Sequence, residues 1–388
     1  MTGPNTPPTV YPPHATLEGV SQTAVAPPLG ADGLAFIKPS VRQQAGYVLA
    51  APPARRKLNQ NESPFDFPLE LKRQIVETTI NQPWQRYPEF SPAELRAGLA
   101  SYYEWIAEGI LTGNGSNELI QATLSVTLGA GDVLVAPAPT FSLYRLLTSV
   151  NSGRYVPVPL DSNFAFDVDR LIDAARRDRA RVIVLNSPNN PTGSALPDDA
   201  VERILAETEA FVVCDEAYQD FGGPTALPLL RQTSRLVVLR TFSKAFGLAG
   251  LRFGIALAHP AVTEEIAKGK LPYNVNLITL AAAGTALQHA STLAARIRQV
   301  IQTRDRFVTA LGRVPGLTVY PSAANFVLFR CRSLPAADLF RRLLGEYGIL
   351  VRDFSASQEL ADCLRVSIGS DEDMDAVLAA IQEILCHE

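Results

Sequence analysis

The sequence has few of the residues that build metal sites, disulfide frameworks and membrane spans. It contains four cysteines and four histidines in 388 residues, and neither set shows the close spacing of a metal-binding or disulfide motif. No apolar run approaches the roughly 20 residues of a membrane-spanning helix. These absences argue against a metal site and against a membrane protein, and they favour a cytoplasmic protein with reduced thiols.

Positive charge, and lysine in particular, is also scarce. The net charge of −4 and the pI of about 5.7 argue against nucleic acid as the main partner. Only six of the 35 basic residues are lysines. One of these, Lys244, lies among apolar residues in the stretch RTFSKAFGLAGLRFG, residues 240–254. This position fits either an ordinary loop lysine or an amine held in a partly buried site.

The N-terminal segment differs from the rest of the chain. Residues 1–30 contain seven prolines, one acidic side chain and no Lys or Arg. This composition predicts a disordered extension over residues 1–35, without the basic start and apolar centre of a signal peptide. We expect residues 36–85 to form an N-terminal arm and part of a small domain, residues 86–280 a large cofactor-binding domain, and residues 281–388 the rest of the small domain.

Helical and strand patterns alternate from about Ala93 onward. Five short apolar segments are expected to be strands, at residues 132–140, 154–160, 181–188, 211–217 and 235–242. Segments with helical patterns, such as residues 116–128 and 198–209, lie between them. Strands that are apolar on both faces and separated by helices predict an α/β fold, with a mostly parallel mixed sheet sandwiched by helices.

The pattern changes after about residue 274. A long helical run is expected over residues 281–311, and strands are expected at residues 349–354 and 363–369. A final helix follows Ser370, which is placed to cap it, with acidic residues in the first turn. This C-terminal part is predicted to be a smaller α+β domain.

Polar residues follow the predicted strands at several points. Asp215 lies where the strand at 211–217 ends, with Tyr218 three residues later, and Asn190 lies between two prolines after the strand at 181–188. Ligands bind at the carboxyl edge of open parallel sheets. Taken alone, Asp215 could equally cap a helix, and Asn190 could simply form a turn.

Two further segments predict a phosphate site. GNGSNELI, residues 113–120, runs from a glycine-rich loop into a helix, which leaves the N–H groups of Ser116 and Asn117 free to bind an anion. TFSK adds the hydroxyls of Thr241 and Ser243, and Arg252 follows as a cation. Glycine-rich loops before helices are common, so the first segment is informative only together with the second.

Together these residues predict one ligand, an aromatic aldehyde with a phosphate and a basic ring nitrogen. Lys244 would form a Schiff base with the aldehyde, because burial favours the neutral amine. Asp215 would pair with the protonated ring nitrogen and make the ring an electron sink. Asn190 and Tyr218 would hydrogen-bond the ring oxygen, and Phe141 would stack on the ring.

The chain resembles the pyridoxal-phosphate aminotransferases of fold type I, and among them the histidinol-phosphate aminotransferase family. The resemblance runs from about Phe36 to the C-terminus through LNQNESP, RYPE, GNGSNE, SPNNPTG, CDEAY, SKAFGLAGLRFG, PSAANF and CLRVSIG. It implies pyridoxal 5'-phosphate as cofactor and Lys244, Asp215 and Tyr218 as catalytic residues. The implied cofactor-binding set is Ser116, Asn117, Phe141, Asn190, Asp215, Tyr218, Thr241, Ser243, Lys244, Arg252 and Tyr87.

The chain departs from the family pattern at three places. The family often has Ala-Asp-Glu where this chain has Ser116, Asn117 and Glu118, and many members have tyrosine where this chain has Phe141. The segment that often reads Pro-Tyr is AGYVLA here, and we align Tyr47 with the family tyrosine.

The resemblance also implies an assembly and a substrate. It implies a homodimer with active sites at the subunit interface, in which Tyr87 reaches the cofactor phosphate of the other subunit. Arg365 would bind the substrate end where the wider superfamily holds a carboxylate, and Arg352, Asn325 and Tyr47 would complete the pocket. Two arginines suit a phosphate dianion. This favours histidinol phosphate as amino donor and 2-oxoglutarate as acceptor, in histidine biosynthesis.

Other readings stay open at this point. The protein could be an aromatic amino-acid aminotransferase, or a decarboxylase or lyase of the same fold, since the reaction depends on which substrate bond lies perpendicular to the ring. A non-catalytic regulator is disfavoured, because residues 1–35 are too short and too uncharged for a DNA-binding module. Arg352 could instead pair with Asp353 or another acid, and Tyr87 could be a packing residue.

Overall fold

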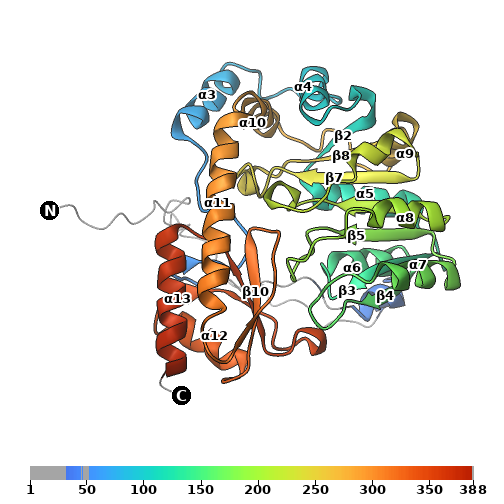
Figure 1. Ribbon diagram of the computed structural model, residues 1–388. Helices are drawn as coiled ribbons and strands as arrows, with labels where there is room; N and C mark the ends of the chain where they lie inside the picture. The colour runs from blue at the N-terminus through green and yellow to red at the C-terminus, as the bar shows by residue number, and fades with distance from the viewer. Residues whose placement is uncertain (1–31, 45, 47–51, 387–388) are drawn as a thin grey trace.

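The computed structural model describes residues 32–44, 46 and 52–386 (Figure 1). Most of the predicted N-terminal extension, through Ala31, and the predicted pocket residue Tyr47 lie outside the described residues. The first elements that the structure describes are two short helices, α1 (Asp32–Ala35) and α2 (Pro39–Arg42). Within the part of the chain that is described, no helix has the length and apolar character needed to cross a bilayer.

The largest sheet has seven strands in the order β2-β8-β7-β6-β5-β3-β4. The five predicted strands are confirmed as β3 (Val133–Ala138), β4 (Arg154–Pro159), β5 (Val182–Asn186), β6 (Phe211–Asp215) and β7 (Leu236–Thr241). They pair with one another in parallel. The sequence does not predict β2 (Ile110–Gly113) or β8 (Gly254–Ala258), and β8 runs antiparallel to both of its neighbours. The sheet is therefore mostly parallel and mixed, as expected.

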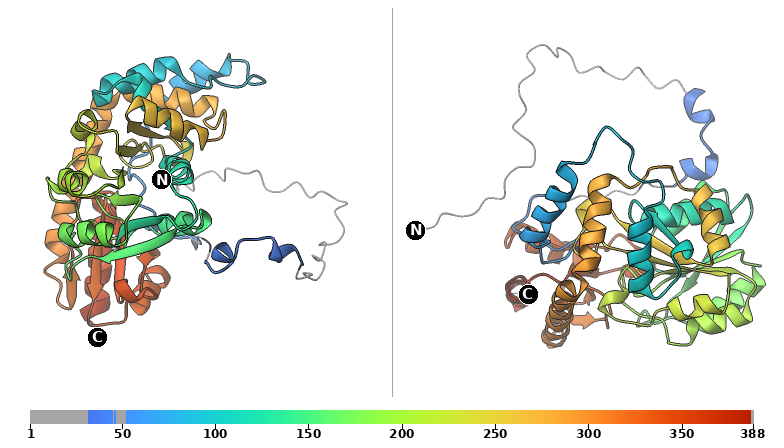
Figure 2. Two further views of the ribbon diagram at one scale, coloured as in Figure 1. Left: turned by 90° about the vertical axis from the view of Figure 1, so that its right-hand side faces the viewer. Right: turned by 90° about the horizontal axis from the view of Figure 1, so that it is seen from above.

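Helices cover both faces of this sheet (Figures 1 and 2). Because side chains alternate along a strand, Val182 and Val184 of β5 belong to one apolar cluster, and Ile183 and Leu185 belong to another. The first cluster includes α5 (Ser116–Thr127), α6 (Leu143–Val150) and α9 (Pro260–Lys268). The second includes α7 (Val168–Arg177) and α8 (Ala200–Glu207). This double cover explains why the strands are apolar on both faces.

The C-terminal part forms a separate antiparallel sheet in the order β12-β13-β10-β9. Its strands are β9 (Leu317–Val319), β10 (Phe326–Cys331), β12 (Arg352–Asp353) and β13 (Cys363–Ser367). The strand expected at 349–354 is divided, because its first half, β11 (Ile349–Leu350), pairs with β1 (Arg56–Lys57) in a two-stranded sheet. The N-terminal arm therefore packs directly against the C-terminal elements.

The remaining helices complete these layers. They are α3 (Leu69–Ile80), α4 (Ala93–Tyr103), α10 (Leu277–Gln288), α11 (Ala290–Leu311), α12 (Ala336–Gly345) and α13 (Asp371–Cys386). The single helix expected over 281–311 is wrong, since the chain leaves helical geometry at His289 and divides it into α10 and α11. The predicted cap is confirmed, because Ser370 Oγ accepts a hydrogen bond from the N–H of Asp373 at 3.1 Å.

Short 3-10 turns connect several of these elements. They are η1 (Ala107–Gly109), η2 (Gln219–Phe221), η3 (Leu227–Arg231), η4 (Ala249–Leu251) and η5 (Gln358–Leu360). The carboxyl ends of β5, β6 and β7 meet at one edge of the large sheet, and β13 and the segment after β1 supply further residues to the pocket at that edge.

Candidate active site

A pocket of about 490 Å³ brings together most of the predicted site residues. The predicted residues in its wall are Ser116, Asn117, Phe141, Asn190, Asp215, Tyr218, Thr241, Ser243, Lys244, Arg252, Arg352 and Arg365. Asn325 is fully buried and lies behind this wall, where its amide nitrogen donates to the carbonyl oxygen of Asn61 at 3.0 Å. The structure therefore places Asn325 as a support behind the pocket. The sequence predicts Asn325 in the pocket lining, and it does not lie there.

Lys244 lies three residues after the end of β7, in a turn that also contains Phe242 and Phe246. Phe242 and Phe246 stack with ring centroids 4.1 Å apart. The Lys244 amine donates to the carbonyl oxygen of Gln60 at 2.9 Å. Burial, with a smaller contribution from the Arg365 charge, lowers the pKa of Lys244 from 10.5 to about 7. A large fraction of this amine is therefore neutral, and nucleophilic, at neutral pH.

Asp215 ends β6 with its carboxylate buried in the pocket wall. The carboxylate accepts hydrogen bonds from the hydroxyl of Tyr144 at 2.7 Å and from the N–H of Ala217 at 3.1 Å. Burial raises the pKa of Asp215, and these two hydrogen bonds oppose the rise. No basic side chain of the described residues forms an ion pair with it, although it faces a pocket.

Sequence reasoning missed Tyr144, which is fully buried and contacts Phe141 edge to face, with ring centroids 5.8 Å apart. The only available signal was its spacing of three residues from Phe141 at the start of a helix. Asn186, at the end of β5, was also missed. Its side chain donates to the carbonyl oxygen of Asp215 at 3.0 Å and accepts from the N–H of Asn190 at 2.8 Å.

The phosphate corner predicted from the sequence is assembled around α5. Helix α5 begins at Ser116, so the N–H groups of its first turn have no carbonyl partner within the helix. Arg252 donates to Ser243 Oγ at 3.1 Å and passes so close to Gly115 that a Cβ there would lie 2.3 Å from the guanidinium. Gly115 has φ +81°, a conformation that glycine adopts readily. Free N–H groups, hydroxyls and one cation therefore converge as a phosphate requires.

A second cationic corner lies across the pocket. Arg365 donates to Asn190 Oδ1 and to the carbonyl oxygen of Asn59, the latter at 2.9 Å. The ring of Phe354 lies 5.5 Å from the Arg365 guanidinium carbon and 5.7 Å from that of Arg352. Arg352 forms no ion pair with any acidic side chain in the described ranges. The alternative of an Arg352–Asp353 pair is therefore not seen.

Tyr87 lies away from this pocket on the surface of the chain. Its side chain is 80% exposed and stacks on Tyr273, with ring centroids 4.6 Å apart. Trp84, Phe90 and Leu271 are also exposed, from nearby stretches of the chain. The structure of one chain thus does not bring Tyr87 into the cofactor corner.

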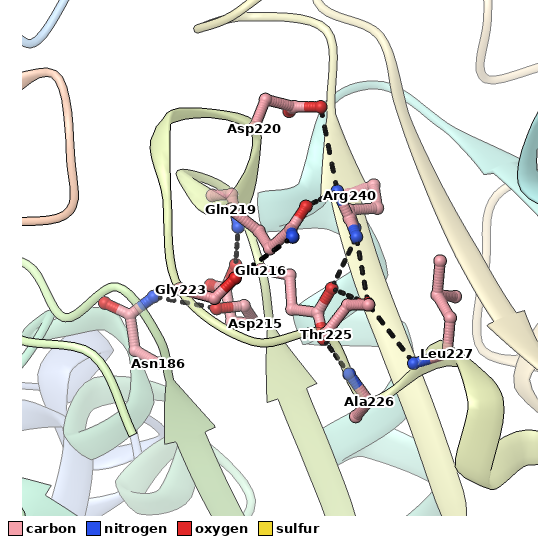
Figure 3. Close-up of polar contacts among 11 residues, drawn as sticks. Asn186, Asp215, Glu216, Gln219, Asp220, Gly223, Thr225, Ala226, Leu227 and Arg240 are labelled. Carbon is pink, nitrogen blue, oxygen red and sulfur yellow. Dashed lines mark hydrogen bonds and ion pairs between the residues drawn. The ribbon is translucent and has the colours of Figure 1, made fainter. Parts of the chain in front are cut away.

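Directly after Asp215, Glu216 belongs to a different polar network (Figure 3). Its carboxylate lies 2.7 Å from the guanidinium of Arg240, and both side chains are buried. Thr225 Oγ and the N–H of Ala226 donate to the same carboxylate at 2.8 and 2.6 Å. Arg240 also donates to Gln219 Oε1 at 2.6 Å. This network ties the end of β6 and the following loop to β7.

Comparisons with known proteins agree with this geometry. Residues 56–381 match the model of the class I and II aminotransferase family, which defines the class of the protein. A histidinol-phosphate aminotransferase from Chlorobium phaeovibrioides is 38% identical over 356 residues, covering 91% of this chain and 98% of that protein. The chain belongs to the histidinol-phosphate aminotransferase family within that class.

Solved structures with the same fold extend the comparison. Histidinol-phosphate aminotransferase from Sinorhizobium meliloti, in complex with pyridoxal 5'-phosphate, has a TM-score of 0.82 at 25% identity and covers 92% of this chain and 100% of its own. L-threonine-O-3-phosphate decarboxylase from Porphyromonas gingivalis has a TM-score of 0.74 at 25% identity and covers 85% and 99%. The predicted fold of the pyridoxal-phosphate-dependent transferases is confirmed.

Proposed function

We propose that the protein is a pyridoxal 5'-phosphate-dependent aminotransferase that transfers the amino group of histidinol phosphate to 2-oxoglutarate, in histidine biosynthesis. One observation carries the proposal. The partly buried amine of Lys244 and the buried carboxylate of Asp215 line one pocket, beside an anion-binding helix terminus. The names of three curated relatives, each a histidinol-phosphate aminotransferase, support the substrate.

The residues present fit this cofactor. Its phosphate would be held by Thr241, Ser243, Arg252 and the first turn of α5, and Phe141 would stack on its ring. Asp215 would accept a hydrogen bond from the protonated ring nitrogen. The positive charge of the ring would offset the free-energy cost of burying the Asp215 carboxylate without a cation. When bound, the cofactor withdraws electrons from the substrate carbon that loses its proton.

One residue of the chain, Lys244, would accept and return a proton during the reaction, and two others would hold the cofactor ring. With its pKa near 7, the Lys244 amine can accept the proton from the substrate α-carbon and return it as an ammonium. General acid–base groups of this kind contribute roughly 10²–10⁴-fold to the rate. Tyr218 and Asn190 would hold the ring oxygen of the cofactor and so fix the plane of the ring against Asp215.

The cationic corner supports a substrate with a phosphate ester. Arg352 and Arg365 both line the pocket, and Arg352 has no acidic partner among the described residues. Each charge-assisted hydrogen bond to a phosphate contributes roughly 1.5–3 kcal/mol. A decarboxylase acting on a phosphorylated amino acid is the second candidate, because the neighbour from Porphyromonas gingivalis is named for such a substrate.

A panel of amino donors tests the substrate. The holoenzyme is mixed with histidinol phosphate, glutamate, phenylalanine or O-phosphothreonine, and the half-reaction is followed by the cofactor absorbance while released CO2 is measured. We expect Arg352→Ala to lower kcat/KM for histidinol phosphate about 10- to 100-fold and to change that for glutamate much less. Arg332→Ala, an exposed arginine of the same C-terminal region, is the matched control. Phenylalanine as the best donor, or CO2 released from O-phosphothreonine, would contradict the proposal.

We also propose that the active form is a homodimer in which Tyr87 of each chain completes the pocket of the other. Support comes from the exposure of Tyr87 and from the exposed apolar side chains around it, since large exposed apolar patches mark interaction sites. Mixing inactive Lys244→Ala and Tyr87→Ala proteins under subunit exchange should restore activity, because one site of each mixed dimer has both residues. An active monomer in sedimentation would contradict the proposal.

A cytoplasmic location is the last part of the proposal. It is supported by the four cysteines, all of which are free thiols in the structure. Cell fractionation should recover the transaminase activity with the cytoplasmic fraction, and recovery elsewhere would overturn this part alone.

A further inference from the structure

Three successive residues after β1 contact three different residues of the pocket. The carbonyl oxygen of Asn59 accepts from Arg365, and that of Gln60 accepts from Lys244, each at 2.9 Å. The side-chain amide of Asn61 donates to the Tyr218 hydroxyl oxygen at 3.0 Å. The first two contacts use backbone atoms, which any residue could supply. The third depends on the side chain of Asn61.

The orientation of the Asn61 amide is fixed by its other partners. Its backbone N–H donates to Ser367 Oγ at 2.7 Å, so the Ser367 hydrogen is free to be donated to Asn61 Oδ1, which lies 3.2 Å away. The amide oxygen is thus occupied as an acceptor, and the amide nitrogen faces Tyr218. Asn61 is only 1% exposed and has φ +55°, a left-handed conformation that asparagine tolerates better than most residues.

This arrangement determines how the Tyr218 phenol can act. Because its oxygen accepts a hydrogen bond from Asn61, its own O–H hydrogen must point in another direction. A hydrogen bond accepted by a hydroxyl also polarises it and makes it a stronger donor. Tyr218 and Asn190 both line the pocket, so a ligand oxygen bound between them can accept a hydrogen bond from the Tyr218 hydroxyl.

We propose that Asn61 is a positioning residue that orients and strengthens the Tyr218 hydroxyl as a hydrogen-bond donor to the ring oxygen of the cofactor. The inference rests on the proposed function, in which Tyr218 holds that oxygen. A stronger donor stabilises negative charge on the ring oxygen, and this favours the deprotonated form of the cofactor chromophore. Asn61 therefore keeps the pKa of the chromophore low.

The test is a pH titration of the cofactor absorbance band in the resting holoenzyme, which needs no turnover. Asn61→Asp keeps the size of the side chain, and aspartate also tolerates a positive φ. The substitution replaces the amide N–H donor with a carboxylate oxygen, which accepts. Asn61→Gly keeps the backbone conformation and removes the side chain without adding charge. We expect the chromophore pKa to rise by about one unit in Asn61→Asp and by a smaller amount in Asn61→Gly.

The same substitutions in a Tyr218→Phe background are the control. There the Asn61 variants should leave the chromophore pKa unchanged, because the hydroxyl they act through is gone. An equal rise of the chromophore pKa with and without the Tyr218 hydroxyl would overturn the inference. No rise in either Asn61 variant, with the wild-type band intact, would also overturn it. Both outcomes would leave the proposed function standing. A wild-type protein with no cofactor band at all would overturn the proposed function as well.

Discussion

Asp215 and Glu216 are consecutive residues at the end of β6, yet their carboxylates lie in two different networks. Glu216 pairs with a buried arginine, Arg240, and accepts two further hydrogen bonds. Among the residues that the structure describes, the Asp215 carboxylate accepts hydrogen bonds from neutral groups alone, the Tyr144 hydroxyl and the Ala217 N–H. Burial raises the pKa of both carboxyls, but only that of Glu216 is opposed by a cation.

The difference separates a carboxylate with a structural partner from one that we propose binds a ligand. An ionised carboxylate in the interior is costly unless a cation and hydrogen bonds compensate it. For Glu216, the chain itself supplies that compensation through the guanidinium of Arg240. On the pocket side the protonated ring nitrogen of the cofactor would supply it. A buried acid without a cation that faces a pocket is therefore the stronger indicator of function.

The largest expected effect comes from neutralising each carboxylate in turn. Asp215→Asn should lower kcat by about 10³-fold, since a neutral ring withdraws electrons poorly, and should leave the free energy of unfolding of the apoprotein unchanged or higher. Glu216→Gln should keep kcat within about tenfold of wild type once folded, and should lose stability. Steady-state kinetics and urea unfolding measure both. Comparable losses of kcat in the two variants would remove the distinction between the networks.

Removing the cation of the structural network should act on stability. Arg240→Met leaves Glu216 buried without its partner, and we expect the free energy of unfolding to fall by about 3–5 kcal/mol. The double variant Arg240→Met/Glu216→Gln should lose less than the sum of the two single losses, because no unpaired charge remains at Glu216. Urea denaturation of the apoproteins gives all three values. Additive losses would mean that the ion pair is not the source of the effect.

Arg240, within β7, and Lys244, three residues after it, should differ in how they change the free energy of unfolding with pH. Between pH 7 and 10.5 Lys244 is protonated in the unfolded chain and mostly neutral in the folded one, so apoprotein stability should rise with pH by up to about 1.4 kcal/mol per unit. Lys244→Met should lose this slope. Burial opposes the charge of Arg240 in the folded protein, but the carboxylates of Glu216 and Asp220 outweigh it and raise the pKa, so Arg240 stays charged in both states. Unfolding at pH 7.5 and 9.5 tests this, and an unchanged slope in Lys244→Met would contradict it.

Much of the site follows from the sequence because its residues lie at strand ends. Asp215, Asn190 and Thr241 could be placed together once their strands were predicted to be parallel neighbours. Contacts between distant segments could not be predicted, since the hydrogen bonds of Asn61 reach Tyr218 and Ser367, 157 and 306 positions away. Nothing in local spacing marks these partners.

The short elements were missed for a similar physical reason. β8 has only five small or apolar residues directly after the phosphate motif, and its antiparallel direction depends on its neighbours in the sheet. The break at His289 interrupts a continuous helical pattern, and no glycine or proline in residues 285–294 marks it in the sequence. The expected domain boundaries stay a prediction.

The protonation state of the cofactor ring nitrogen tests the central claim most directly. Holoenzyme prepared with ¹⁵N-labelled pyridoxal 5'-phosphate can be examined by NMR in the wild type, in Asp215→Asn and in Glu216→Gln. Our account predicts a protonated nitrogen in the wild type and in Glu216→Gln, and an unprotonated one in Asp215→Asn. An unprotonated nitrogen in the wild type, or a protonated one in Asp215→Asn, would contradict it.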